Sequence, residues 1–346
     1  MEKRFLIARW LGSSDAQPTP IYDEASVSAA RQRVRETAQR FQLSKEIGEK
    51  VALIASELTR NQLAHSKQGY FVVRPIERQH VKGLEVIAAD IGPGIARPTH
   101  AIQDAIAPQS SLGAGLGAVC RLADEVEFDN RLLEGMCIVV RNFEKRPPSQ
   151  SCEIAIMGKP FPGEMISGDD AVFFHSESGV LAGVADGLGH GPEAREASNV
   201  AVEALSKNRQ MDLDRILFTL NQELGSTRGC AMSIARFNDS DRTLECASVG
   251  DVHCHLYNLR DAHFFTSTPL VLGAAHSAKP RIRTEKATVE PGSILVIFTD
   301  GLKSRTTLKG QLDVLRQRPI AIAEHLLETY RRPDDDALVL VARFLR

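Results

Sequence analysis

Acidic residues stand at the ends of strand-like apolar runs in the second half of the sequence. They are Asp169 and Asp170 before AVFF, Asp186 after GVLAGVA, Asp300 after SILVIF, and Asp335 with Asp336 before ALVLVARF. Carboxylates at the edges of adjacent strands can converge on a pair of divalent cations, which offset the repulsion between like charges. Two such ions, roughly 3.5–4 Å apart, can activate a water for attack on a phosphate monoester. For a single Asp-Gly, an ordinary turn is the simpler interpretation.

Polar residues form a stripe in the first half of the sequence. Glu57, Asn61 and His65 recur at every fourth position of SELTRNQLAH, which places them on one face if the segment is helical. A solvated helix face is the alternative for this stripe taken alone. For His65, a packing or hydrogen-bonding role is at least as well supported as a catalytic one.

Two groups of glycines follow that stripe. They are Gly92 and Gly94, after Asp90 in DIGPG, and Gly113, Gly115 and Gly117 in SLGAGLGAVCRL. A glycine loop at the start of a helix lets backbone N–H groups approach phosphate oxygens without side-chain obstruction. Tight turns are the alternative for each group alone. The chain contains no GxxxxGK[ST] sequence, which argues against a P-loop enzyme.

Composition and charge narrow the class of protein. With 346 residues, the chain is long enough for two domains. Its composition, 43% apolar and 25% charged, is typical of a globular protein. The 42 basic and 44 acidic residues nearly cancel, so we expect no nucleic-acid partner. Apolar stretches are too short for a signal peptide or a membrane span, which predicts a cytoplasmic protein without a membrane partner. The six cysteines form no CxxC pair, which predicts reduced thiols and no zinc site.

The segment FEKRPPSQSCE at 143–153 mixes charge, a Pro-Pro pair and small polar residues. It predicts an exposed linker over 145–151, between a domain at 1–144 and another at 152–346. In the first domain, helices with Ser caps are expected over 25–43 and 44–66, with a further helix over about 115–124. Strands are expected near 69–76, 82–90 and 136–142. This is an α+β arrangement, with helices on one face of a sheet.

The second domain has many short strand-like runs and three helical patterns. The strands are expected at 153–158, 180–185, 230–237, 244–249, 252–259, 293–299 and 337–344, and the helices at 192–206, 212–224 and 316–330. Two sheets flanked by helices fit this order.

The order of the N-terminal motifs resembles the GHKL ATP-binding (Bergerat) fold, an α/β sandwich. Its N, G1 and G2 boxes correspond to Glu57–Asn61, Asp90–Gly94 and Gly113–Gly117. The short interval between the last two boxes, and the continuation GAGLGAVCRLADE, are similar to the anti-sigma serine kinases of the RsbT and RsbW kind over most of 20–143. The resemblance implies ATP and Mg²⁺ as cofactors.

The roles that this resemblance implies suit the residue types. Asp90 would accept a hydrogen bond from the adenine amino group, and Asn61 would hold Mg²⁺ through its amide oxygen. Glu57 would be the base that accepts a proton from a protein serine. The glycines Gly92, Gly94, Gly113, Gly115 and Gly117 would line the nucleotide, with the last three covering its phosphates.

The C-terminal series SGDD, VADGLGHG, FTDG and DDDALVLV is similar to metal-dependent phosphatases of the SpoIIE, RsbU and RsbX kind, over about 152–346. Their PPM-type fold is an α-β-β-α sandwich. The resemblance implies Mn²⁺ or Mg²⁺ as cofactor, with metal ligands from Asp169, Asp186, the Gly187 carbonyl, Asp300 and Asp335. Gly187 would let the main chain turn its carbonyl toward the cation.

The sequence departs from this pattern at several positions. Three successive acids leave the ligand open between Asp335 and Asp336, and Ala337-Leu338 replaces a pair that usually ends in threonine. The phosphate-binding arginine near the start of eukaryotic relatives has no strong match. His190 is interpreted as part of the glycine turn. His253 and His255 share a strand face, but without a third ligand they are interpreted as ordinary strand residues.

Together the two resemblances predict a bifunctional switch enzyme. One half would phosphorylate, and the other dephosphorylate, a STAS-domain anti-sigma antagonist, and the tether would raise their effective concentration around it. A sigma factor or another switch protein is a second candidate partner, and a homodimer is a candidate state. In a first alternative, the N-terminal half binds ATP or a sigma factor without catalysis and regulates the phosphatase. In a second, the phosphatase half is a degenerate scaffold.

Overall fold

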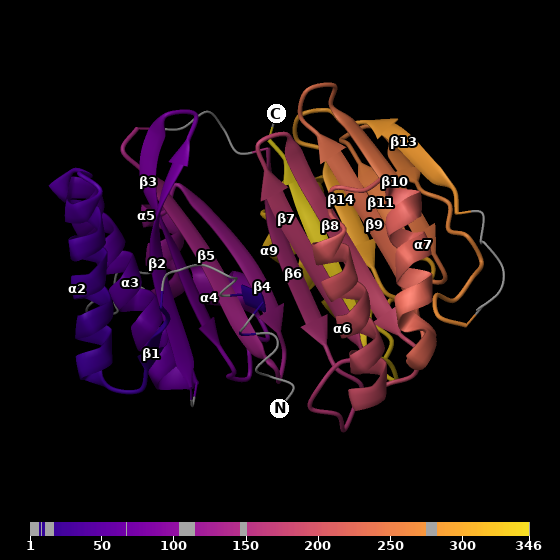
Figure 1. The fold of residues 1–346 in the computed structure, drawn as a ribbon, viewed down its shortest axis with the longest axis horizontal. Helices are drawn as coiled ribbons and strands as arrows, with labels where there is room; N and C mark the ends of the chain where they lie inside the picture. The colour runs from indigo at the N-terminus through magenta and orange to yellow at the C-terminus, as the bar shows by residue number, and fades with distance from the viewer. Residues whose placement is uncertain are drawn as a thin grey trace. The chain divides into compact units, whose positions relative to one another are not determined.

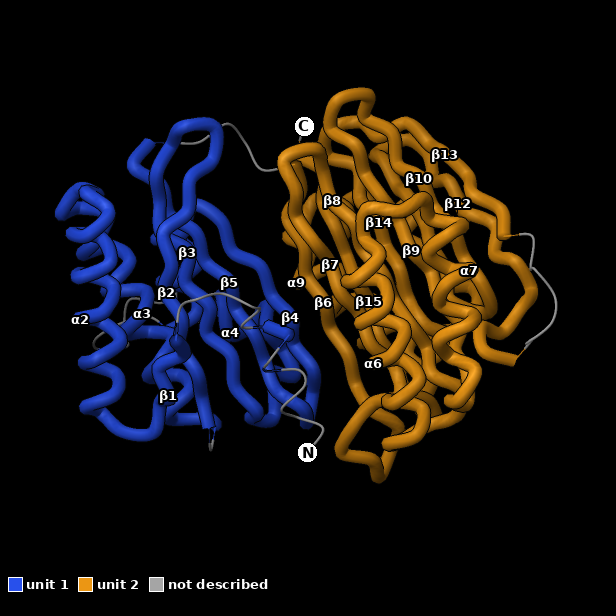
Figure 2. Tube along the Cα trace, viewed as in Figure 1, with its two compact units in different colours: residues 1–150 blue, residues 151–346 orange. Residues whose placement is uncertain are grey.

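The computed structural model describes residues 7, 9–10, 17–66, 68–103, 115–145, 151–274 and 282–345. The chain forms two compact units, an N-terminal unit of Met1–Gln150 and a C-terminal unit of Ser151–Arg346 (Figure 2). Most of the linker predicted at 145–151 lies outside the described residues.

The N-terminal unit is a five-stranded antiparallel sheet with helices on one face (Figure 1). Its strands lie in the order β1-β2-β3-β5-β4. The elements are β1 (Thr19–Ile21), α2 (Glu24–Arg40), α3 (Lys45–His65), β2 (Gly69–Arg78), β3 (Val81–Asp90), α4 (Pro98–Gln103), α5 (Gly115–Leu122), β4 (Glu125–Arg131) and β5 (Gly135–Phe143). Strand β4 was missed by the sequence analysis because its polar letters, EVEFDNR, do not form an apolar run.

The two long helices begin where side chains satisfy their first backbone N–H groups. Ser44 caps α3 as predicted, accepting a hydrogen bond from the N–H of Ile47 at 3.3 Å. The expected serine cap of α2 is wrong, because Asp23 is its N-cap and Ser26 is the third helical residue. Their side chains and N–H groups bond reciprocally at 2.7 and 3.1 Å, which is a capping box.

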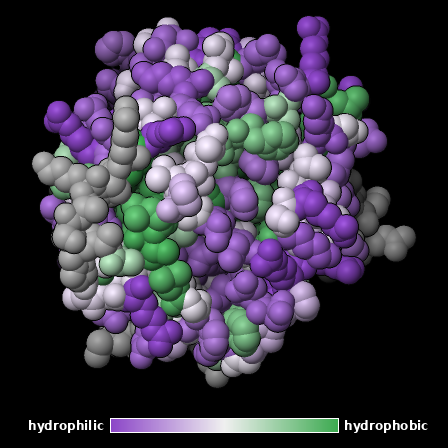
Figure 3. All heavy atoms as spheres, turned by 90° about the vertical axis from the view of Figure 1, so that its right-hand side faces the viewer, coloured by the Kyte–Doolittle hydropathy of each residue, from purple (hydrophilic) through white to green (hydrophobic). Residues whose placement is uncertain are grey.

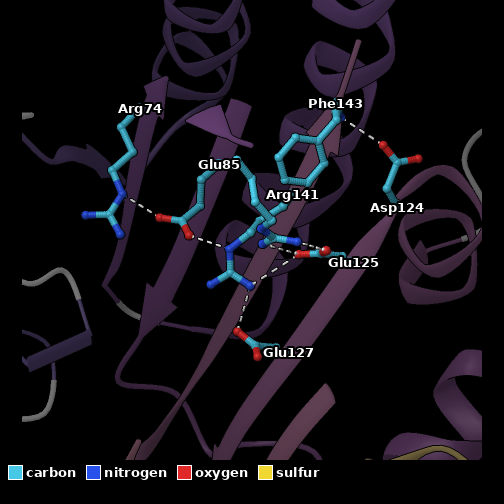
Figure 4. A network of polar contacts seen from close by, with 8 residues as sticks. Arg74, Glu85, Asp124, Glu125, Glu127, Arg141 and Phe143 are labelled. Atoms are coloured by element: carbon cyan, nitrogen blue, oxygen red, sulfur yellow. Dashed lines mark hydrogen bonds and ion pairs between the residues drawn. The ribbon is translucent and has the colours of Figure 1, made fainter. Parts of the chain in front are cut away.

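The sheet face opposite α2 and α3 carries a ladder of ion pairs (Figure 4). Arg141 of β5 donates to Glu85 of β3 at 2.7 Å and to Glu127 of β4 at 2.9 Å. Burial lowers the pKa of Arg141, but its acidic neighbours outweigh this and raise the pKa above its ordinary value. Arg74 and Glu125 extend the ladder through ion pairs to Glu85 and Arg141. Charged side chains therefore cover part of these strands, and an apolar cluster that includes Val72, Ile87, Ala89 and Cys137 covers another part.

The C-terminal unit consists of two stacked sheets with helices outside them. One sheet has the order β6-β15-β14-β11-β12 and the other β13-β10-β9-β8-β7. Their elements are β6 (Cys152–Lys159), β7 (Asp169–Ser176), β8 (Gly179–Gly187), α6 (Pro192–Lys207), α7 (Leu213–Glu223), η2 (Leu224–Ser226), β9 (Cys230–Asn238), β10 (Thr243–Val249), β11 (His253–Tyr257), β12 (Ala262–Phe264), β13 (Thr284–Thr288), β14 (Ile294–Phe298), α8 (Leu312–Leu315), α9 (Pro319–Tyr330) and β15 (Ala337–Phe344).

Apolar side chains from both sheets fill the space between them. Ile156, Ile297 and Leu340 of one sheet and Val184 of the other belong to one fully buried cluster. A second cluster joins the outer face of β8 and β9 to α6 and α7, while α9 packs against β6 and β15. The predicted α-β-β-α sandwich is therefore confirmed.

The surface in Figure 3 is mostly hydrophilic, as the 25% share of charged residues in the sequence leads one to expect. Hydrophilic residues cover most of the face in Figure 3, around a short strip of hydrophobic ones. All six cysteines have free thiols, and five of them are buried. Among the described helices, none is both long and apolar enough to span a bilayer.

Candidate functional site

Two acidic residues of the C-terminal unit face each other across neighbouring strands. Asp169 begins β7 and Asp186 lies near the end of β8, and the antiparallel register makes the two direct partners. Asp169 is 1% exposed, and its pKa is raised well above the ordinary value, first by burial and then by the charge of Asp186. Two acids in this position repel each other unless a proton or a cation lies between them.

Thr299 connects this pair to the second sheet. Its hydroxyl donates to Asp169 Oδ2 at 2.8 Å and accepts from the N–H of Leu338 at 3.0 Å. The Thr299 N–H also donates to the Leu338 carbonyl at 3.1 Å. Since Thr299 follows β14 and Leu338 lies in β15, this residue fixes Asp169 against the strand ends where Asp300 and Asp335 stand. Thr299 belongs to the FTDG segment, but a threonine at a strand end carries no signal of this role in the sequence.

Asp300 and Asp335 join the pair from the second sheet. Burial raises the pKa of Asp186, and Asp300 raises it further through its charge and a side-chain hydrogen bond. The pKa of Asp335 is raised by burial and by the charge of Asp300. Asp186, Asp300 and Asp335 all remain partly exposed. The charge of Asp300 therefore opposes ionisation of Asp186, and a bound cation would offset that repulsion.

Asp336 has a different role from Asp335. Its Oδ1 accepts the Phe161 N–H at 2.7 Å and its Oδ2 accepts the Gly168 N–H at 3.0 Å. Asp336 is only 3% exposed. It therefore anchors the loop between β6 and β7, and its charge also raises the pKa of Asp169 and Asp186. Asp335 is half-buried, and its charge acts on Asp186.

The glycine-rich turn after Asp186 needs its glycines for two separate reasons. Gly189 and Gly191 have φ angles of +90° and +74°, a region that only glycine adopts readily. Gly187 is the last residue of β8 and has no positive φ angle. The expected turn is therefore made by Gly189 and Gly191 and not at Gly187. A Cβ on Gly187 would lie 1.9 Å from the Ala194 carbonyl oxygen. Its missing side chain lets α6 approach the strand that ends in Asp186.

Arg195 and His190 support the site from the same segment. Arg195 on α6 is 3% exposed, and its guanidinium donates to the Asp169 carbonyl at 3.0 Å. His190 stacks on Phe161 with ring centroids 4.2 Å apart, and its Nδ1 lies 3.3 Å from Glu164. These contacts agree with His190 as a residue of the turn. Arg195 gave no sequence signal because a buried arginine and a surface arginine look alike in a helical pattern.

His253 and His255 lie in an aromatic cluster on β11. His253 stacks on Phe298, and His255 Nδ1 lies 2.9 Å from the Tyr257 hydroxyl. Burial and the neighbouring His253 lower the pKa of His255 to about 3. In the described parts of the chain, no group of three or more His, Cys, Asp or Glu side chains surrounds a single point as ligands of one ion.

In the N-terminal unit, Asp90 ends β3 beside the last turn of α3. The Gly92 N–H donates to Asp90 Oδ1 at 2.8 Å. Burial raises the pKa of Asp90 to about 6, while Gly92, the Ser66 hydroxyl and the charge of His65 act in the opposite direction. The carboxylate is thus held at the end of an interior strand, where burial opposes its ionisation and nearby hydrogen-bond donors favour it.

Gln62 and Asn130 fix the segment around Asp90, and neither residue carries a signal of this role in the sequence. Gln62 Nε2 donates to the carbonyls of Tyr70 at 3.1 Å and Ala89 at 3.0 Å, which ties α3 to β2 and β3. The Asn130 amide bonds both the N–H and the carbonyl of Ile95. A Cβ on Gly94 would meet this amide oxygen at 2.7 Å, so Gly94 is needed there.

The remaining predicted nucleotide residues lie on the helices. Glu57, 6% exposed, and the half-buried Asn61 are one turn apart on α3. Gly115, with φ of +53°, begins α5, and Gly117 is buried in its first turn. Helix α5 packs against α3. Gly113 lies outside the described residues.

Comparisons with known proteins agree with this division. The family model described as stage II sporulation protein E (SpoIIE) matches residues 176–345, and the histidine kinase-like ATPase domain matches residues 22–141. The phosphoserine phosphatase RsbX of Bacillus subtilis (strain 168) is 33% identical over 141 residues, 40% of this chain and 69% of RsbX. The serine/threonine-protein kinase RsbT of the same strain is 31% identical over 122 residues, 35% of this chain and 92% of RsbT.

The chain belongs to the histidine kinase-like ATPase family and to the SpoIIE family. Its C-terminal unit is thus a PPM-type serine/threonine phosphatase domain, and its N-terminal unit a GHKL-like domain, as the sequence predicted.

Two solved structures have the fold of the SpoIIE-family unit. One, described as "The bacterial stressosome: a modular system that has been adapted to control secondary messenger signaling", is 27% identical with a TM-score of 0.53, covering 56% of this chain and 100% of its own. The crystal structure of RsbX in complex with magnesium is 24% identical with a TM-score of 0.51, covering 57% of this chain and 97% of its own. The second supports the fold alone.

Proposed function

We propose that the SpoIIE-family unit removes phosphate from serine or threonine of a STAS-domain anti-sigma antagonist, and that the ATPase-family unit phosphorylates the same protein with ATP. The observation that supports hydrolysis most directly is the meeting of Asp169 and Asp186 with Asp300 and Asp335 at one end of the sandwich. The relatives named as a phosphoserine phosphatase and a serine/threonine-protein kinase support the pairing of the two activities.

The acidic residues fit Mn²⁺ or Mg²⁺ by their chemistry. They provide only oxygen atoms, and burial and mutual repulsion oppose their negative charge. Asp169, Asp186, Asp300 and Asp335, with the Gly187 carbonyl, would hold the ions, whose positive charge would offset the repulsion between these acids. Bound ions would lower the pKa of a water and orient it for in-line attack on the phosphate.

The protein's own contribution is to position these oxygens. Thr299 fixes Asp169 from the opposite sheet, Arg195 holds the main chain at the start of β7, and Asp336 holds the loop before it. None of these three needs to move when a substrate enters, because their bonds are to the protein. The site is therefore organised before binding, which reduces the reorganisation needed for reaction.

In the ATPase-family unit, Asp90 would bind the adenine amino group and Asn61 would bind Mg²⁺. Glu57 would accept the proton of the attacking serine hydroxyl. Its position one helical turn from Asn61 supports this arrangement, since both side chains then face the same side of α3.

The phosphatase proposal is tested with Asp186→Asn and, as a matched control, Asp334→Asn, which alters an exposed neighbour of Asp335. Phosphate release from a phosphoserine STAS protein with Mn²⁺ should fall at least a hundredfold in Asp186→Asn, and Mn²⁺ should no longer raise its melting temperature. Asp334→Asn should behave as the wild type. Full hydrolysis by Asp186→Asn would refute the ligand assignment.

The kinase proposal is tested with Glu57→Gln, compared with Glu46→Gln at an exposed position of the same helix. Transfer of phosphate from ATP to a STAS protein, followed by mass spectrometry, should be lost only in Glu57→Gln, while ATP affinity is kept. A wild type that binds ATP but transfers no phosphate would instead support the non-catalytic regulatory module.

A further inference from the structure

Arg228 occupies a position from which it can reach the substrate. It lies between η2 and β9, directly before the strand that pairs with β8. In that pairing Cys230 is opposite Gly187 and Ala231 is opposite Asp186. The Leu188 N–H also donates to the Gly229 carbonyl at 3.1 Å. The main chain of Arg228 is therefore fixed beside the turn that follows Asp186.

The guanidinium of Arg228 lies over this glycine turn. Its Nη1 is 3.0 Å from the position that a Cβ on Gly189 would occupy. Any side chain at Gly189 would push the guanidinium away. Gly189 is therefore needed both for the positive φ angle of the turn and for the space that the Arg228 guanidinium occupies.

Glu193, in the first turn of α6, holds the other side of the guanidinium in an ion pair. The side chains of Arg228 and Glu193 are 50% and 66% exposed. An ion pair this exposed contributes little stability. Arginine can exchange such a partner for a phosphate at small cost, because its fork of N–H donors matches two phosphate oxygens.

The other arginines around the acidic residues are placed differently. Arg195 is buried and bonded to the Asp169 carbonyl. Arg331 donates to the carbonyls of Pro160 at 3.1 Å and Asp335 at 3.1 Å. Arg332 lowers the pKa of Asp335 by its charge, so it acts on the acids from the β15 side. Among these, only Arg228 is held by an exposed acid beside the turn after Asp186.

We infer that Arg228 binds the phosphate group of the substrate and that Glu193 holds its guanidinium in readiness when substrate is absent. This inference builds on the proposed phosphatase function and supplies the phosphate-binding arginine for which the sequence offered no candidate. It also predicts that Glu193 competes with phosphate for the same donors.

The test measures binding of inorganic phosphate to the full chain with Mg²⁺ by titration calorimetry, so that it needs no turnover. Arg228→Gln should weaken phosphate binding about ten- to a hundredfold, the worth of hydrogen bonds between charged groups. Glu193→Gln should tighten it about two- to fivefold, because the competing carboxylate is gone. Arg215→Gln, which breaks an exposed ion pair with Asp212 on another helix, controls for general electrostatic attraction and should change the affinity for phosphate less than threefold.

Opposite effects of the two variants separate phosphate binding from a structural role, since both break the same ion pair. Weaker binding in both, or unchanged binding in Arg228→Gln, would overturn the inference. With a phosphoserine peptide, the KM of Arg228→Gln should rise more than its kcat falls. If the wild type binds phosphate with this pattern but releases none from the peptide, the proposed function fails while the role of Arg228 stands.

Discussion

Burial opposes ionisation of the Asp90 carboxyl group. Asp90→Asn replaces this group with a neutral amide of nearly the same shape. In the wild type, burial raises the pKa of Asp90 from 3.8 to about 6. Because the folded pKa is the higher one, folding is favoured below pH 3.8, and that contribution is lost as the pH rises through about 6. Asp90→Asn has no ionisable group at this position, so its folding free energy does not lose this contribution as the pH rises.

The rise in the pKa of Asp90 from 3.8 to about 6 on folding corresponds to about 3 kcal/mol of unfolding free energy. Water still reaches the half-buried carboxylate, which reduces the expected gain to about 1 to 2 kcal/mol. Asp90→Asn should therefore stabilise the N-terminal unit at pH 7.5 and have little effect near pH 4. The Gly92 N–H can still donate to the amide oxygen, so the turn is kept.

Nucleotide binding should change in the opposite direction. If Asp90 accepts the adenine amino group, ATP favours the ionised carboxylate, and wild-type affinity should fall below pH 6. In Asp90→Asn, ATP affinity should fall at least tenfold because a charged acceptor is lost. A gain in stability together with a loss of binding is typical of a residue kept for function.

The assay uses urea unfolding at pH 4.5 and 7.5, followed by the fluorescence of Trp10. This is the only tryptophan of the chain, and it bonds Asp129 of β4, so it reports on the N-terminal unit. Glu36→Gln, at an exposed position on α2, is the control. An equal effect of Asp90→Asn at both pH values, or destabilisation at pH 7.5, would refute the reasoning.

Two further substitutions test the framework of each unit. Gly187→Ala would place a Cβ 1.9 Å from the Ala194 carbonyl oxygen, so Mn²⁺-dependent phosphate release should fall at least tenfold. Glu196→Ala, at an exposed position of α6, is the control and should keep activity. Equal activity of the two variants in a phosphate-release assay would contradict this. Arg141→Leu leaves Glu85 and Glu127 without their shared partner and should cost about 3 to 5 kcal/mol of unfolding free energy, measured by urea unfolding with Trp10 fluorescence. Arg35→Leu removes a partly exposed ion pair with Glu49 and should change the midpoint little. A similar result for Arg141→Leu would show that the ladder is not needed for stability.

The sequence by itself determined the two families, the sandwich layers and most of the elements. Period and capping are local properties, so Ser44 and the pattern after it sufficed to place α3. Apolar runs such as SILVIF and ALVLVARF revealed the strands of the C-terminal core, because both faces of these strands are buried. Because each run is almost entirely apolar, the acids that stand at its end, such as Asp300 and Asp336, could be recognised in the sequence.

Only the tertiary structure decided how those acids are held and which of them face one another. The difference between Asp335 and Asp336 depends on which N–H groups lie nearby, and Phe161 and Gly168 are far away in the sequence. Thr299 and Arg228 gain their positions from strand pairing, and neither residue type differs locally from an ordinary loop residue. Contacts between distant segments are fixed by packing, which no local pattern of letters encodes.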